Sequence, residues 1–283
     1  MEKDHRLTPE EMVELRRWRP PFLEFPVHKV LEHQFGLCIR GIEDAIVIGP
    51  RGTGKTKSVV RACQDVRSTE AERVIEESSY MPREVVYYEA CKADGAKTAL
   101  LDLYREIFHG GSPISARSQS PHSLREHIAD EAVRRNIRLV CVDEAQLISS
   151  ENLDMLRQVP DALRARGHMA GLMLVGSEEL RDRLRKIKQL GQRFSGEVVF
   201  PRADRKTVAP HLTGFHPHLP SLQKSLKAGE WGALEAEIFR AANGSMRRFM
   251  RIIENAHELV LRWERRLDAK LVRMAIQKLA AED

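Results

Sequence analysis

The sequence has few cysteines and no pattern that would pair them or gather them around a metal. Cys38, Cys63, Cys91 and Cys141 form no CxxC motif and have no spaced histidine nearby. Neither a zinc site nor a disulfide framework is therefore expected. The segment 211–218 holds three close histidines but no acidic or cysteine partner, and we expect no metal there either.

Long apolar runs are also missing. No stretch approaches the roughly 18 residues that a membrane span needs. The first residues, MEKDHRLTPEEM, are charged and lack the apolar centre of a signal peptide. There is no internal repeat and no long low-complexity segment. We therefore expect a cytoplasmic globular protein without a membrane partner.

The composition that is present suits a folded protein. The chain has 283 residues, of which 42% are hydrophobic and 31% charged. This is enough for one large domain, or for a medium domain and a small one. The net charge of +5 is a mild basic bias. It is compatible with an anionic partner such as nucleic acid but does not by itself establish one.

The first 43 residues read as helical segments around a connector. Thr8 as N-cap, Pro9 at the first helical position and Glu11 form a capping box. The proline-rich segment 19–26 then ends this helix, and residues 27–42 show helical spacing of apolar residues. We expect residues 1–43 to form an N-terminal helical segment with its connector.

The hydrophobic pattern of the sequence changes at residue 44. Short apolar runs alternate with longer helical patterns, which is typical of an α/β fold with a parallel sheet covered on both faces. The runs predict five strands: 45–49, 84–90, 137–144, 171–177 and 196–201. After residue 210 only helical patterns remain, at 221–244, 245–267 and 268–280. We predict a three-layer α/β core over 44–206 and a small C-terminal helical lid domain over 207–283.

The segment GPRGTGKT matches the phosphate-binding pattern G-x-x-x-x-G-K-[ST] through Gly49, Gly54, Lys55 and Thr56. It follows a predicted strand and opens a predicted helix, which is the setting the pattern requires. Backbone N–H groups and the helix N-terminus then surround the phosphates, and Lys55 reaches the β- and γ-phosphates. The residues expected to bind ATP are Gly49, Pro50, Arg51, Gly52, Thr53, Gly54, Lys55, Thr56 and Lys57.

The second chemical signal is LVCVDEAQ at 139–146. An apolar strand leads into Asp143, which is expected to hold Mg²⁺ together with the Thr56 hydroxyl. Glu144 can polarise the attacking water as a general base. An acid pair of this kind favours hydrolysis over phosphoryl transfer to a small molecule, and no arginine-rich nucleoside-kinase lid is visible. We therefore expect a Mg²⁺-dependent ATPase.

These motifs, together with LVGS (174–177), GQRF (191–194) and GSMRRF (244–249), follow one another as in AAA+ ATPases. More narrowly, VDEAQ followed by LVGSEELRDRLRKIKQLGQRF resembles the transposition-regulator ATPases of the TnsC, TniB and MuB type. The resemblance runs from about residue 28 to the C-terminus. Related secretion and helicase-loader ATPases share parts of the pattern. It implies a P-loop NTPase core of AAA+ type with a helical lid.

The resemblance also implies roles for three further residues. Ser177 stands at the sensor 1 position, where AAA+ proteins often have asparagine; it is equally placed to cap the helix that follows. Arg193 matches an arginine finger that enters a neighbour's site, with Arg181, Arg183 and Arg185 as rivals. Arg247 fits sensor 2 at the head of a lid helix. Simple surface charge is the alternative for all these arginines.

Partners follow mainly from the same resemblance. The family assembles with ATP as rings or filaments on duplex DNA and passes a target site to a transposase. Residues that could contact phosphates, without reading sequence, are Lys92, Lys97, Arg117, Arg181 and Arg185. His28 lies where family members contact adenine, and we expect a structural role for it.

The first functional hypothesis is thus a slow, assembly-coupled ATPase that regulates DNA transposition. It would assemble on DNA with ATP, recruit or activate a transposase with a target-selection protein, and disassemble on hydrolysis. Two alternatives are open. One is an AAA+ loader or secretion-associated ATPase. The other is a nucleotide-gated scaffold, against which the presence of Glu144 argues.

Overall fold

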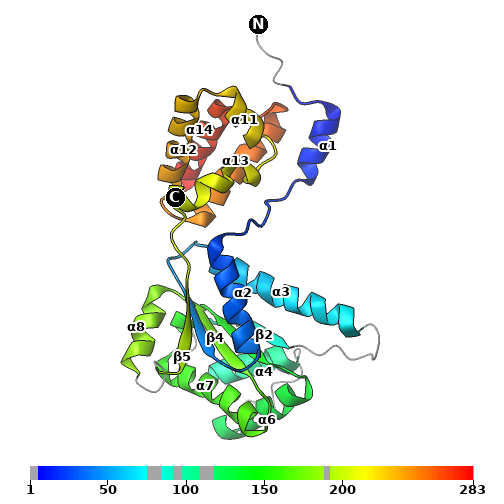
Figure 1. Cartoon of the computed structure of the whole chain (residues 1–283), viewed down its shortest axis with the longest axis vertical. Coiled ribbons are helices and arrows are strands. Elements are labelled where there is room, and N and C mark those ends of the chain that lie inside the picture. The colour runs from blue at the N-terminus through cyan, green and yellow to red at the C-terminus, as the bar shows by residue number, and fades with distance from the viewer. Residues whose placement is uncertain (1–5, 75–83, 92–96, 109–117, 188–191, 283) are drawn as a thin grey trace. The chain divides into compact units, whose positions relative to one another are not determined.

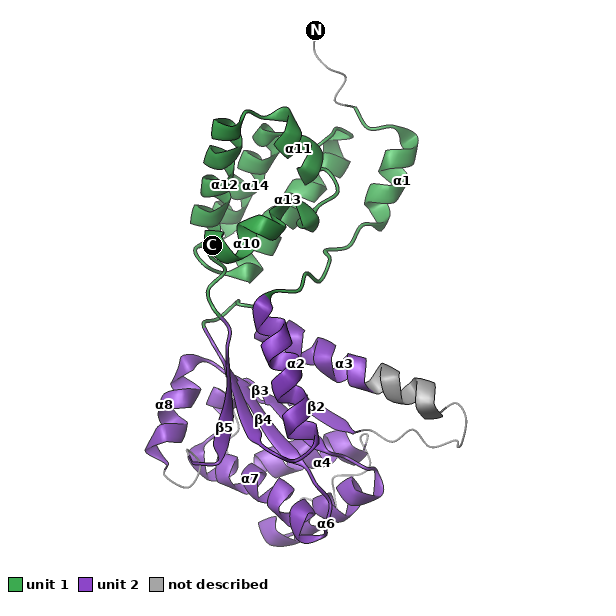
Figure 2. Ribbon diagram, in the orientation of Figure 1, with its two compact units in different colours: residues 1–25, 50–54, 201–283 green, residues 26–49, 55–200 purple. Residues whose placement is uncertain are grey.

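The computed structural model describes residues 6–74, 84–91, 97–108, 118–187 and 192–282, without the side chains of 67–74. The described chain divides into two compact units (Figure 2). Unit 1 comprises residues 1–25, 50–54 and 201–283, and unit 2 comprises residues 26–49 and 55–200. Each unit is therefore built from segments that are distant in the sequence.

Unit 2 is organised around a five-stranded sheet in the order β2-β3-β4-β1-β5. All neighbouring strands run parallel. The strands are β1 (Asp44–Ile48), β2 (Val85–Glu89), β3 (Leu139–Asp143), β4 (Gly171–Gly176) and β5 (Phe194–Val199). The central strands β1, β3 and β4 are buried at every position, which explains why their sequences are unbroken apolar runs.

Helices cover both faces of this sheet (Figure 1). On one face α2 (Pro26–Ile39) and α3 (Lys55–Val74) pack over alternate strand residues, including Val47 and Cys141. On the other face the helices pack over the intervening residues, including Ile46 and Val140. They are α4 (Thr98–Phe108), α6 (Pro121–Arg134), α7 (Ser150–Ala165) and α8 (Glu178–Lys186). The three-layer α/β prediction is confirmed.

Unit 1 is helical. Its elements are α1 (Pro9–Arg17), α10 (Arg205–Val208), the 3-10 segment η2 (Ala209–Phe215), α11 (Leu219–Ser225), α12 (Ala228–Ala242), α13 (Met246–Trp263) and α14 (Ala269–Glu282). One apolar core joins them and includes Leu15 from α1 and Phe249 from α13. The predicted capping box at the start of α1 is present, with both Thr8–Glu11 contacts formed.

The packing groups the N-terminal residues differently from the sequence pattern. The pattern set residues 1–43 apart as one segment. In the structure residues 1–25 pack with the C-terminal helices, whereas α2 packs on the sheet. The reason is that the apolar residues of α1 and those of α2 face different cores. Across the part of the chain described here, every helix is too short or too polar to cross a membrane.

Candidate nucleotide site

The parallel sheet brings the predicted motifs to one edge. Because every strand runs in the same direction, the carboxyl ends of the strands meet at that edge, where ligands of open α/β sheets bind. Gly49 directly follows β1, Asp143 ends β3, and Ser177 directly follows β4. The three motifs recognised separately in the sequence are thereby gathered on three adjacent strands.

The turn out of β1 requires glycine at position 49. Gly49 has φ +154°, and a Cβ placed there would lie 2.4 Å from the carbonyl oxygen of Phe200. Phe200 is held beside the turn because its N–H donates to the carbonyl of Ile48 at 2.8 Å. Any side chain at position 49 would therefore push the loop away from β5.

The rest of the loop has the features of a phosphate cradle. Gly54 has φ +97°, and no heavy atom of the described residues beyond its chain neighbours lies within 4 Å of the position its Cβ would take. Thr53 Oγ1 donates to the carbonyl of Pro50 at 2.9 Å. Lys55 begins α3 and its Nζ donates to the carbonyl of Gly49 at 2.8 Å. The loop thus has a lysine and a helix N-terminus, the groups that bind phosphate oxygens.

The remaining residues of the motif flank this cradle. Thr56 follows in the first turn of α3 and is exposed, as are Arg51 and Lys57. In unit 1 the carbonyl of Gly52 accepts a hydrogen bond from the backbone N–H of Arg247 at 3.0 Å. The Arg247 side chain itself is exposed. The predicted sensor 2 residue therefore lies next to the loop within the same unit.

Asp143 is buried, and both carboxylate oxygens are occupied. Oδ1 accepts from the backbone N–H of Glu144 at 2.7 Å, and Oδ2 accepts from the hydroxyl of Tyr87 at 3.0 Å. Burial first, and then the nearby Asp143 charge, raise the pKa of Tyr87. Tyr87 thus stays protonated and donates. Sequence reasoning missed Tyr87, because only the pairing of β2 with β3 brings it beside Asp143.

Ser177 behaves differently from an ordinary helix cap. It is the N-cap residue of α8, but its side chain makes no capping hydrogen bond. Within the described chain its Oγ is buried and has no hydrogen-bond partner. Its backbone N–H is bound by the side chain of Gln146 at 3.1 Å. No hydrogen bond therefore supports a capping role for the Ser177 side chain. Its hydroxyl is available to another group.

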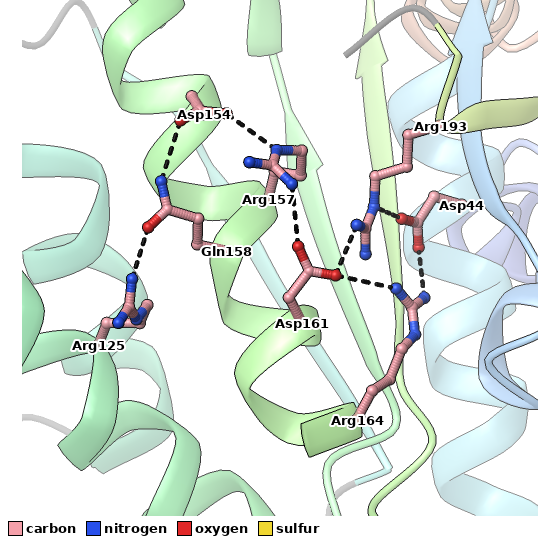
Figure 3. Close-up of polar contacts among 8 residues, drawn as sticks. All are labelled: Asp44, Arg125, Asp154, Arg157, Gln158, Asp161, Arg164 and Arg193. Atoms are coloured by element: carbon pink, nitrogen blue, oxygen red, sulfur yellow. Dashed lines mark hydrogen bonds and ion pairs between the residues drawn. The ribbon is translucent and has the colours of Figure 1, made fainter. Parts of the chain in front are cut away.

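Arg193 is held inside unit 2 by a network of charges (Figure 3). Its Nε binds Asp44 Oδ2, and its Nη1 lies 2.5 Å from Asp161 Oδ1. Asp44 also accepts from Arg164 Nη2 at 3.1 Å and from the N–H of Leu172 at 2.8 Å. Asp44 begins β1, so this network lies at the opposite end of the strand from Gly49.

The rivals of Arg193 differ in their surroundings. Arg181 pairs with Glu197, and Arg183 donates to the main-chain carbonyls of Gln146 and Ile148. Arg185 is exposed and makes no ion pair with any described residue.

The predicted DNA contacts are only partly visible. Lys92 and Arg117 lie outside the described residues. Lys97 is half-buried and donates to the carbonyl of Gln119 at 2.7 Å. Of the described candidates, only Arg185 is fully exposed. His28, in α2, is buried with its ring centroid 6.0 Å from that of Phe200.

The parallel sheet, the glycine loop and the acidic end of β3 together define a P-loop nucleotide-binding protein. The family model of the AAA domain matches residues 45–184. Residues 45–184 are therefore similar to the AAA-type P-loop ATPases, as the sequence motifs predicted. No curated protein matches the sequence.

Many solved structures are similar to this chain, and three of them follow. The Orc1 protein of Aeropyrum pernix, solved in complex with DNA, has a TM-score of 0.64 at 16% identity, over 96% of this chain and 69% of that one. Cdc6p of Pyrobaculum aerophilum has a TM-score of 0.62 at 13% identity, over 97% and 72%. Domain III of the Thermotoga maritima replication initiation protein DnaA has a TM-score of 0.52 at 14% identity, over 96% and 98%. At these identities the likeness shows the fold.

Proposed function

We propose that this protein is an ATPase whose nucleotide state controls its own assembly on duplex DNA, and that it regulates DNA transposition. The observation that carries the proposal is the acid pair at the end of β3. Asp143 is buried and fixed by two hydrogen bonds, and Glu144 follows it at the edge of the sheet that also carries the phosphate loop. A protein that only bound nucleotide would not need Glu144 there.

Each residue then has a chemical role. Lys55 and the N–H groups of residues 51–54 bind the phosphates, and Mg²⁺ would be held by Thr56 and Asp143. The metal would neutralise charge on the β- and γ-phosphates. Glu144 takes the proton from the attacking water. The Ser177 hydroxyl, which has no hydrogen-bond partner among the described residues, contacts that water or the γ-phosphate. Arg247 reports nucleotide state to the helical unit.

Assembly on DNA is supported by two observations. The fold is similar to that of an Orc1 protein solved in complex with DNA. The sequence phrases VDEAQ and LVGSEEL resemble those of transposition regulators. The expected partners are further copies of this chain in a ring or filament, duplex DNA of any sequence, a transposase and a target-selection protein, in the cytoplasm. ATP must bind the assembled state more tightly than the free subunit.

A second function is favoured by the fold comparisons. Cdc6p and the DnaA domain are also similar to this chain, which supports a loader or initiator of DNA replication. The two functions differ in geometry. For a regulator that coats DNA, the number of protein copies bound increases with the length of the duplex. A loader instead forms one ring of fixed size.

The test is binding to random-sequence duplexes of increasing length, measured by fluorescence anisotropy and electron microscopy. With a slowly hydrolysed ATP analogue we expect binding at least tenfold tighter than without nucleotide, which is about 1.4 kcal/mol of coupling. Glu144→Gln should form persistent assemblies with ATP itself, and Lys55→Ala should form none. Equal DNA binding with and without nucleotide contradicts the proposal. Rings whose size does not change with DNA length favour the loader.

A further inference from the structure

The turn after β3 places Glu144 in an unusual backbone conformation. Glu144 has φ +52°, in the left-handed region that non-glycine residues seldom adopt. The 3-10 segment η1 (Ala145–Leu147) follows at once. Through this turn the side chain of Gln146 comes back to Glu144, and its Nε2 donates to Glu144 Oε2. Strain at a non-glycine residue persists only where the surroundings hold it in place.

The other end of the Gln146 carboxamide is bound as well. Its Oε1 accepts from the backbone N–H of Ser177 at 3.1 Å. A Cβ on the neighbouring Gly176 would lie 2.4 Å from Gln146 Oε1, so a side chain there would displace this amide. One end of the amide thus meets a carboxylate, which only accepts, and the other meets an N–H, which only donates. The amide orientation is therefore fixed by its partners.

Helix α8 holds the backbone of the same turn. Arg183 Nη1 donates to the carbonyl of Gln146 at 2.6 Å, and Nη2 donates to the carbonyl of Ile148. Side chain and main chain of Gln146 are therefore both tied to the segment that begins at the end of β4. None of these contacts is needed to bind phosphate.

We propose that Gln146 is the positioning residue for Glu144 and links the direction of its carboxylate to the end of β4 at Ser177. The inference rests on the proposed hydrolysis of ATP by Glu144. Gln146 holds Oε2 and leaves Oε1 to take the proton from water. Gln146 itself exchanges no proton.

Two substitutions separate the two ends of the amide. Gln146→Glu keeps an acceptor for the Ser177 N–H but places a second carboxylate against Glu144. Gln146→Leu removes both bonds at similar volume. We expect kcat to fall roughly tenfold or more in both, because small misplacements of a catalytic group are costly. The affinity for a fluorescent ATP analogue should stay within about twofold, since phosphate binding does not use Gln146.

A double-mutant comparison distinguishes positioning from mere support of the turn. If Gln146 acts by holding the Glu144 carboxylate, adding Gln146→Leu to Glu144→Gln should lower the residual kcat no further, because the group that Gln146 holds is already absent. An equal fall of kcat in the wild-type and Glu144→Gln backgrounds would mean that Gln146 only stabilises the turn, and the proposal would be wrong.

Gln158 on α7 supplies a matched control. Its Oε1 accepts from Arg125 at 2.5 Å and its Nε2 donates to Asp154 Oδ2 at 2.9 Å, so it too joins a donor to a carboxylate. Gln158→Glu should leave kcat unchanged. If both Gln146 variants match the wild type, Gln146 does not position Glu144. If the wild type binds nucleotide but hydrolyses it no faster than Glu144→Gln, the proposed hydrolysis fails, and the role of Gln146 fails with it.

Discussion

Arg193 shows how the role of one side chain depends on its immediate neighbours. Its sequence position matches an arginine that acts on another subunit. In the structure its guanidinium binds Asp44 and Asp161, and only 18% of its side chain is exposed. Reaching another subunit would require both contacts to break. A buried carboxylate such as Asp44 is costly when it loses its partners.

Arg193→Ala should therefore destabilise unit 2. We expect the free energy of unfolding to fall by about 2–4 kcal/mol, because Asp44 keeps only Arg164 and one N–H as donors. Asp44→Asn should lower the free energy of unfolding much less in the Arg193→Ala protein than in the wild type, because both changes break the same ion pair. Urea unfolding followed by circular dichroism measures this.

Arg185→Ala is the control for that measurement, because Arg185 is exposed; a change within about 0.5 kcal/mol is expected. An Arg193→Ala protein of wild-type stability that lost only ATP hydrolysis would assign Arg193 to a neighbour's site instead.

Residues whose partners are close in sequence could be predicted, and those whose partners are distant could not. Gly49, Lys55 and Thr56 form one continuous motif. By contrast, Asp44 and Arg193 are 149 residues apart, and Tyr87 and Asp143 are 56 apart. Such pairs arise only when the strands assemble in a non-sequential order.

At the scale of elements, α1 illustrates the same limit. Its capping box follows from four adjacent residues and was predicted. The side chains against which α1 packs were not predicted. Trp18, just after α1, packs its ring 4.4 Å from that of His257 and 5.2 Å from that of His216. Sequence spacing could not show that the histidine just after η2 and a histidine of α13 would meet there.

The hydrogen bonds of these histidines fix their protonation. The N–H of His218 donates to Nδ1 of His216, so His216 carries its proton on Nε2, which lies 3.1 Å from Nδ1 of His257. The N–H of Leu267 donates to Nδ1 of His218. Mainly through burial, the pKa of His216 is lowered to about 3, and those of His218 and His257 are also lowered. All three imidazoles are neutral near pH 7.

Acid should therefore weaken unit 1. At pH values between the unfolded pKa of about 6.5 and the folded pKa of His216 near 3, this histidine is protonated in the unfolded chain but not in the folded chain. The free energy of unfolding should fall as the pH drops below 6.5, by up to ~1.4 kcal/mol per pH unit for each such histidine. Tryptophan fluorescence can follow this, since Trp18, Trp231 and Trp263 all belong to unit 1.

His216→Gln should reduce that slope, whereas His33→Gln, at an exposed position of unit 2, should leave it unchanged. Constant stability between pH 6.5 and 5 would mean that the cluster accepts protons while folded.

At the scale of the whole molecule, the N-terminal segment, which ends at residue 25, packs with the C-terminal helices of unit 1, which lie beyond residue 201. Leu7 donates its N–H to the carbonyl of Glu264 at 3.0 Å, and Arg266 binds Glu11 at 2.7 Å. Leu15 is buried in the core of unit 1. The sequence pattern could predict an α/β core followed by helices, but apolar spacing in α1 does not say which core it joins.

Leu15→Ala should consequently destabilise the C-terminal helices. We expect a loss of about 2–4 kcal/mol in the unfolding free energy reported by tryptophan fluorescence, because a buried leucine leaves a cavity. Val13→Ala, on the exposed side of α1, is the control and should change it by less than about 0.5 kcal/mol. An unchanged transition for Leu15→Ala would mean that the segment is dispensable for unit 1.

The interleaving of the two units has a consequence for the gene. Because the helical unit takes residues from the start, from the phosphate loop and from the end of the chain, no single recombination joint can exchange it for that of a relative. A hybrid joined at residue 201 would combine foreign helices with a native Gly52 and a native α1, whose partners are Arg247 and the core around Phe249. Chimeras of this protein should therefore carry all three segments from one parent.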